Sequence, residues 1–170
     1  MSTISTIPTL SPYIGPIVIA MVLTAAATDL QRRRIPNWLT FGAWLVALPV
    51  QMTIHGLGAG SSAWAMGWLT GFGIFLPLYL MRGMAAGDVK LMAAVGAWLG
   101  ADLALWIALA TFVMGGAWAL TMVLLSGKAR QLARNLGGIV LTGQGGPSVG
   151  SLPYGAVIAA GTLTMLFART

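Results

Sequence analysis

The longest uncharged stretch of the chain decides its fold class, and it runs from residue 35 to residue 81 as IPNWLTFGAWLVALPVQMTIHGLGAGSSAWAMGWLTGFGIFLPLYLM. A membrane-spanning helix needs about 20 predominantly apolar residues, so this stretch is too long for a single span. The glycine- and serine-rich segment HGLGAGSS at residues 55–62 is typical of a turn and divides the stretch. We therefore expect one helix at residues 38–54 and another at residues 63–81.

The composition extends this character to the whole chain. Of its 170 residues, 58% are hydrophobic and 7% are charged, and the mean hydropathy is +0.87. A typical soluble domain carries about 25% charged residues, so a soluble globular enzyme is excluded. A disordered chain is excluded too, because such chains are poor in apolar residues. We expect an all-α integral membrane protein in which residues 1–170 form a single polytopic domain.

Charged residues divide the rest of the chain into further apolar segments. The complete set of expected helices is residues 10–28, 38–54, 63–81, 89–100, 103–125 and 152–168. The first segment could be a signal peptide, since the three alanines at residues 25–27 resemble a cleavage site. Its basic residues follow the apolar run instead of preceding it, which is the reverse of a signal peptide. We therefore expect it to be a retained helix.

Six helices place nearly all basic residues on one side of the membrane. These residues are Arg32, Arg33, Arg34, Arg82, Lys90, Lys128, Arg130 and Arg134. Cytoplasmic loops collect Lys and Arg, so the net charge of +6 is explained and both termini are expected outside the cytoplasm. The basic segment at residues 128–141 could lie flat on the inner membrane surface. The short fourth helix must be shielded by protein or line a cavity, because lipid tolerates no unsatisfied backbone.

The residue types that are missing exclude several chemistries. Cysteine is absent and His55 is the single histidine, which excludes disulfides, thiolate metal sites, a cysteine nucleophile and multi-histidine metal sites. We expect no metal and no cofactor. The basic charge is assigned to membrane loops, so no nucleic-acid partner is expected.

Three aspartates are the only acidic residues of the chain. Asp29 ends the first expected helix and Asp88 begins the fourth, so both lie at the expected cytoplasmic face, although the sequence does not show that these helices meet. Asp102 falls in a short outer loop, where Asp favours turn and helix-start positions. Two carboxyl groups within reach of each other share one proton, so that one activates water and the other polarises a carbonyl group, as in aspartic proteases. Alone, each acid could instead be a charge-balanced helix end, with Arg32 or Lys90 nearby.

Two longer motifs surround these acids. DLQRRRIPNWLT at residues 29–40 and AGDVKLMAAVGAWLG at residues 86–100 resemble the two signatures of type IV prepilin leader peptidases, and LPYG at residues 152–155 is similar to the start of that family's last helix. The resemblance implies a multi-pass aspartic endopeptidase of the bacterial cytoplasmic (inner) membrane that needs no cofactor. Its implied substrates are prepilins or pseudopilins, cleaved at the cytoplasmic membrane edge after the glycine that ends a short basic leader. By position, Asp29 and Asp88 are the implied catalytic pair.

Neighbouring residues have expected supporting roles. Pro36 suits the first turn of the second helix, because its missing N–H would be unpaired there in any case. Asn37 can hydrogen-bond nearby backbone, and Gly87 lets a backbone approach the acid closely. Lys90 could hold Asp88 ionised, bind a lipid headgroup or anchor the helix at the membrane interface.

Two features depart from the family pattern. Ala85 stands where the second signature has its first glycine. Alanine is small but disfavours positive φ, so activity depends on whether the loop needs small size or that backbone angle. Larger members carry a cysteine-rich metal-binding insertion between the first two helices and also methylate their product. This chain resembles the short, single-domain branch associated with tight-adherence pili, and methyltransferase activity is not expected.

Two other functions fit parts of the pattern. A non-enzymatic membrane transporter or assembly subunit could use the acids to bind a proton or a cation, but transport favours acids near the membrane midplane. An intramembrane protease of the presenilin-like class would place its acids deeper within helices and would leave the Ile-Pro-Asn motif at residues 35–37 unexplained. The prepilin peptidase hypothesis accounts for more of the sequence than either.

Overall fold

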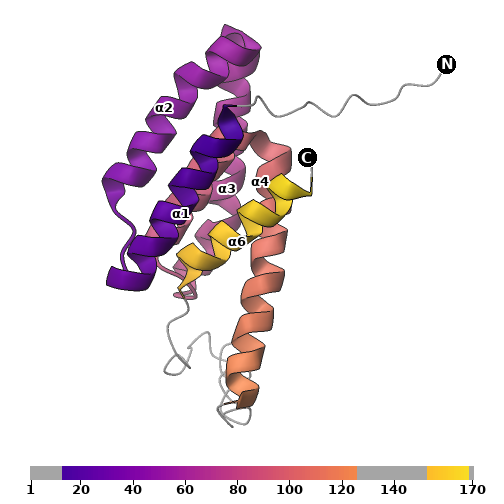
Figure 1. The fold of residues 1–170 in the computed structure, drawn as a ribbon. Coiled ribbons are helices and arrows are strands. Elements are labelled where there is room, and N and C mark those ends of the chain that lie inside the picture. The colour runs from indigo at the N-terminus through magenta and orange to yellow at the C-terminus, as the bar shows by residue number, and fades with distance from the viewer. Residues whose placement is uncertain (1–12, 126–152, 169–170) are drawn as a thin grey trace, which may run out of the picture.

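The computed structural model describes residues 13–125 and 153–168, and their regular structure is entirely α-helical. The helices are α1 (Ile14–Arg32), α2 (Asn37–His55), α3 (Leu57–Leu80), α4 (Ala86–Leu125) and α6 (Tyr154–Phe167). They pack side by side in one bundle (Figure 1). The prediction of an all-α fold is confirmed for these residues. The predictions for residues 10–12, 128–141 and 152 concern parts of the chain outside the described residues.

Helix α4 turns back on itself at Gly100, where the backbone is non-helical with φ 79° and ψ 172°. A straight helix of its 40 residues would be about 60 Å long, twice the ~30 Å hydrocarbon core of a bilayer. Residues 86–99 and 101–125 instead lie against each other, because a Cβ built on Gly96 would lie 3.3 Å from the Cβ of Ala104. The predicted separation of a fourth and a fifth helix is therefore confirmed, with Gly100 itself as the break.

The buried side chain of Gln51 on α2 supports this break. Its Nε2 donates to the carbonyl oxygens of Ala97 (3.2 Å) and Trp98 (2.8 Å), which directly precede the break. The last carbonyl groups of a helix have no partner within the helix, and leaving them buried and unpaired costs free energy. Gln51 thus allows the end of the first part of α4 to lie inside the protein.

The turn between α2 and α3 is shorter than predicted. Gly56 alone separates the two helices, with φ 83° and ψ 164°, so α3 begins at Leu57 and the expected start at residue 63 is wrong. The small residues of the expected turn allow helix packing instead. A side chain on Gly60 would collide with the backbone of Gln51, and the hydroxyl of Ser61 donates to the carbonyl of Leu57 at 2.6 Å. Small residues bring membrane helices together in this way.

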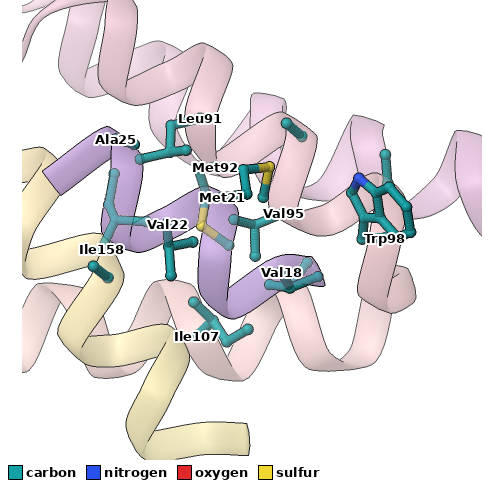
Figure 2. Close-up of a cluster of buried hydrophobic side chains, with 14 of the residues drawn as sticks. Val18, Met21, Val22, Ala25, Leu91, Met92, Val95, Trp98, Ile107 and Ile158 are labelled. Atoms are coloured by element: carbon teal, nitrogen blue, oxygen red, sulfur yellow. The ribbon is translucent and has the colours of Figure 1, made fainter. Parts of the chain in front are cut away.

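The first part of α4 lies at the centre of the bundle. Residues 91–98 are all buried, and α3 packs so closely that the backbone of Gly67 meets that of Gly96. Side chains of α1, α6 and the second part of α4 cover its other sides, as Figure 2 shows for a cluster that includes Val18, Met21, Val22, Leu91, Met92, Val95, Ile107 and Ile158. The prediction that the short fourth helix is shielded by protein is confirmed.

The outer surface of the bundle is strongly apolar. Large hydrophobic side chains such as Val113 and Trp38 are 72% and 71% exposed, which suits lipid better than water. Among the described residues, three helices are long and apolar enough to cross a membrane, namely α1, α3 and the Ala86–Met122 portion of α4. The total of six spans and the side on which the termini lie stay predictions.

One end of the bundle gathers the ends of several helices. In Figure 1 the C-terminal end of α1 and the N-terminal ends of α2 and α6 lie towards the lower left, well above the C-terminal end of α4. There a backbone N–H of α6 donates to the side chain of Asp29 on α1, and the side chain of Lys90 on α4 donates to that of Asn37 on α2. This end therefore brings together residues that are far apart in the sequence, including two of the three acids.

Candidate active site

Asp29 lies near the C-terminal end of α1, with its side chain only 8% exposed. The helix stops three residues later, because Arg33 adopts the left-handed conformation (φ 51°, ψ 32°) and its backbone N–H donates to the carbonyl oxygen of Asp29 at 2.8 Å. The carboxyl group points towards α6, where the backbone N–H of Gly155 donates to Oδ2 at 3.0 Å. A role as a charge-balanced helix end explains neither this burial nor this contact.

The N-terminus of α6 is directed at the carboxyl group of Asp29. The first N–H groups of a helix have no partner within it, and the helix dipole adds positive potential at that end. Gly155 lies in the first turn of α6, directly after Tyr154. A Cβ at this position would lie 3.0 Å from both Cβ and Oδ2 of Asp29. Glycine therefore allows the backbone of α6 to come close enough to donate this hydrogen bond.

Asp88 is the third residue of α4, and its side chain is 4% exposed. Its Oδ2 accepts a hydrogen bond from the backbone N–H of Ala85 at 3.1 Å, while its own N–H donates to the carbonyl of Ala85 at 3.1 Å. This is the arrangement by which an acid at the third helical position reaches back to the residue before the helix. Asp88 thus stabilises the start of α4 and is held in one orientation by doing so.

The two acids lie at the same end of the bundle, Asp29 at the end of α1 and Asp88 at the start of α4. Asp29 and Asp88 are close enough for their charges to interact, and the phenol of Tyr154 interacts with Asp88 in the same way. Each carboxyl group uses Oδ2 to accept a backbone N–H. The structure therefore buries both predicted catalytic residues at one end of the bundle and holds each with a backbone N–H. Within the described residues, no group of three or more His, Cys, Asp or Glu side chains could hold a metal ion.

Gly87 and Pro36 have roles slightly different from those predicted. A Cβ on Gly87 would lie 3.3 Å from the Cβ of Ile35. The group that comes close to Gly87 is therefore a side chain of the link between α1 and α2. Pro36 directly precedes α2, with φ −64° and ψ 134°, and does not lie in its first turn. Its carbonyl oxygen accepts the N–H of Leu39 at 3.2 Å. Both residues fix the path of the chain beside Asp88.

The side chains of Lys90 and Asn37 contact each other, and Lys90 does not contact Asp88. The Nζ of Lys90 donates to Oδ1 of Asn37 at 3.0 Å, which links the first turns of α4 and α2. Residues two positions apart on a helix point about 200° away from each other, so Lys90 faces away from Asp88. Lys90 and Asp88 both belong to the described part of the chain, and no ion pair joins these two residues. A hydrogen bond from Asn37 to nearby backbone stays a prediction.

Ala85 and Asp102 also have clear positions. In the described residues, positive φ occurs outside glycine at Arg33 and Arg82, and not at Ala85. The loop before Asp88 therefore needs no glycine for its backbone angle at residue 85. Asp102 is exposed, two residues beyond Gly100 at the far end of the first part of α4. Asp102 thus lies near the start of the second part of α4, which is one of the positions expected for it.

Gly155 and Tyr154 are absent from the predicted site. The Pro-Tyr-Gly motif at residues 153–155 contains a usable signal, because a proline before a glycine-containing apolar segment is typical of a helix start. Which acid that helix start contacts depends on how α6 packs against α1. This contact lies 126 positions apart in the sequence and has no local signal.

A comparison with protein families finds a match for this chain. The family model described as the type IV leader peptidase family matches residues 17–120. The matched segment contains both buried acids and ends before α6. Searches of curated proteins and of solved structures find no match.

Proposed function

The chain belongs to the type IV leader peptidase family, and on this premise we propose that it is a membrane-embedded aspartic endopeptidase. Its proposed substrates are prepilins or pseudopilins, from which it removes the short basic leader. The observation that supports the proposal is the burial of two acids, Asp29 and Asp88, on separate helices at the same end of the bundle. An ion pathway would favour acids near the middle of the membrane, whereas both acids here lie at helix ends.

The proposed reaction uses the two carboxyl groups as a unit. Two such groups at close range hold one proton between them. The ionised group takes a proton from water while the water oxygen forms a bond to the scissile carbonyl carbon, and the protonated group donates to the carbonyl oxygen. The C–N bond then breaks: the group that took the proton from water gives it to the leaving amine, and a hydroxyl of the intermediate returns a proton to the other carboxyl group as the carbonyl re-forms. The Gly155 N–H holds the carboxyl group of Asp29 in one orientation during these steps.

The position of the site supports the proposed substrate. A prepilin has a basic leader in the cytoplasm and an apolar helix in the membrane, so its scissile bond lies at the membrane edge. Asp29 and Asp88 lie at the bundle end where the basic residues Arg32 and Arg82 are exposed, which fits the cytoplasmic face of the bacterial inner membrane. We propose a single-domain, multi-pass enzyme of six spans with both termini on the opposite side.

Leader processing in membranes tests this function. We expect Asp29→Asn and Asp88→Asn each to abolish the leader-sized mobility shift of a cognate prepilin, because general acid–base groups contribute about 10²–10⁴-fold in rate. Asparagine keeps the size and an acceptor oxygen, so both variants should insert at wild-type levels. Asp102→Asn is the matched control and should process normally. Processing by either asparagine variant, or an equal loss in Asp102→Asn, would contradict the assignment.

A further inference from the structure

A partly open groove lies between α2, α3 and the first part of α4, and its volume is about 430 Å³. Its walls are aromatic, from Phe41, Trp44, Trp68 and Phe72, while Asn37 and Lys90 line it at the first turns of α2 and α4. Trp44 and Trp68 have ring centroids 6.3 Å apart, and Trp68 stacks on Phe72 at 5.6 Å. The groove therefore has a long apolar wall and one polar, cationic end.

This groove is separate from the acid pair. Lys90, Ala93 and Ala94 line it, and they occupy one face of α4 because residues three to four positions apart lie above one another. Asp88 lies about 200° around the helix from Lys90 and faces Asp29 and Tyr154. A peptide seated in the groove would have α4 between itself and the acids. The groove thus does not suit the scissile segment of a substrate.

The charge at the polar end indicates what the groove binds. No acidic residue lines the groove, and the exposed ammonium group of Lys90 is held in place by Oδ1 of Asn37 at 3.0 Å. An ammonium group carries three donors, so Lys90 can donate to Asn37 and to an anionic ligand at once. The ligand that fits has an anionic head beside a long apolar chain.

We propose that the groove is a binding site for an anionic phospholipid. The phosphate group lies at Lys90 and Asn37, and one acyl chain lies against the aromatic walls. Lys90 is on the side of the bundle that carries Arg32 and Arg82, where an anionic leaflet attracts basic residues. A lipid bound there bridges the first turns of α2 and α4. The first turn of α4 also contains Asp88.

Quenching of tryptophan fluorescence by brominated lipid tests this site in the purified full chain. The protein is reconstituted in phosphatidylcholine vesicles that contain a fixed small fraction of either brominated phosphatidylglycerol or brominated phosphatidylcholine. We expect stronger quenching by the brominated phosphatidylglycerol. A double variant, Trp44→Phe with Trp68→Phe, should lose the part of the quenching that depends on the headgroup, because these are the groove tryptophans.

Charge variants connect the preference to Lys90. Lys90→Gln should reduce the preference for phosphatidylglycerol about fivefold, which corresponds to the ~1 kcal/mol contributed by one cation at an anionic surface. Lys90→Arg should retain it. Arg82→Gln is the matched control, since it removes an exposed cation from the link between α3 and α4 and should leave the preference unchanged.

Four results would overturn the proposal. Equal quenching by the two brominated lipids in the wild type would remove the headgroup preference. Equal effects of Lys90→Gln and Arg82→Gln would show general attraction of the surface to anionic lipid. Loss of the preference on adding soluble glycerol phosphate would assign Lys90 to a free phosphate, and loss on adding an apolar helical peptide would assign the groove to a protein partner. Because the assay measures binding, its outcome is independent of leader cleavage.

Discussion

Replacing Gly155 by alanine tests the candidate site with a single methyl group. The new Cβ would lie 3.0 Å from both Cβ and Oδ2 of Asp29, inside the ~3.5–4.0 Å optimum for non-bonded carbon contacts. Either the carboxyl group or the start of α6 must then move by several tenths of an ångström. The backbone N–H of residue 155 is retained, so the change alters the position of Asp29 without removing its donor.

The size of the effect follows from this displacement. Misplacing a reacting group by about 1 Å costs roughly 10²-fold in rate. About half that displacement predicts an approximately tenfold loss, equivalent to ~1.4 kcal/mol in the activation barrier. The loss should appear in kcat with KM nearly unchanged, because the proposed role of Asp29 is in the transition state. Alanine is a better helix former than glycine by about 1 kcal/mol, so the folded protein should not be depleted.

The assay combines leader cleavage kinetics with thermal unfolding in the same detergent. Gly73→Ala is the matched control, because Gly73 is a helical glycine of α3 with no atom within 4 Å of an added Cβ. It should cleave like the wild type. Wild-type kcat in Gly155→Ala would refute the argument that this contact positions Asp29. A fall in activity that only parallels a loss of folded protein would refute it as well.

Three further changes test the fold and the loop before Asp88. Gly100→Ala should lower the free energy of unfolding by about 1–3 kcal/mol, because φ 79° with ψ 172° is almost restricted to glycine. Gly116→Ala is the control and should not lower it, because there is open space around the added Cβ. Thermal unfolding in detergent compares the two variants. Gln51→Met should cost about 1 kcal/mol in the same measurement, since the carbonyls of Ala97 and Trp98 lose a donor while a buried, unpaired Oε1 is removed at the same time. Ala85→Gly should cleave prepilin at close to the wild-type rate, because residue 85 has no positive φ; a large gain in kcat would show that the alanine limits this enzyme.

Much of the fold could be predicted because the signals are local. The lengths of the apolar segments and the low content of charged residues predict a helical membrane protein before any contact is known. Gly100 could be recognised as a break because a single span from residue 89 to residue 127 would put the basic residues that follow it on the opposite side of the membrane from the other basic residues. The start of α3 could not be predicted, since glycine and serine serve both turns and close helix packing. At Gly60 the backbone of Gln51 decides for packing.

The candidate site divides in the same way. Asp29 and Asp88 stand out in the sequence because the chain has only three acids, and their positions at helix ends follow from the apolar segments beside them. The partners of the neighbouring side chains could not be predicted. Lys90 contacts Asn37 because the first turns of α2 and α4 lie side by side, and this depends on the packing of both helices.

The sequence by itself determined the class of protein, the approximate helices and the identity of the two acids, because each depends on residue type and spacing along the chain. Only the tertiary structure decided that the two acids are buried at one end of the bundle, that Gly155 donates to Asp29, and that an aromatic groove lies on the other face of α4. These features depend on where α1, α2, α3 and α6 pack around the buried first part of α4. Such packing joins residues far apart in the sequence, and no local pattern records it.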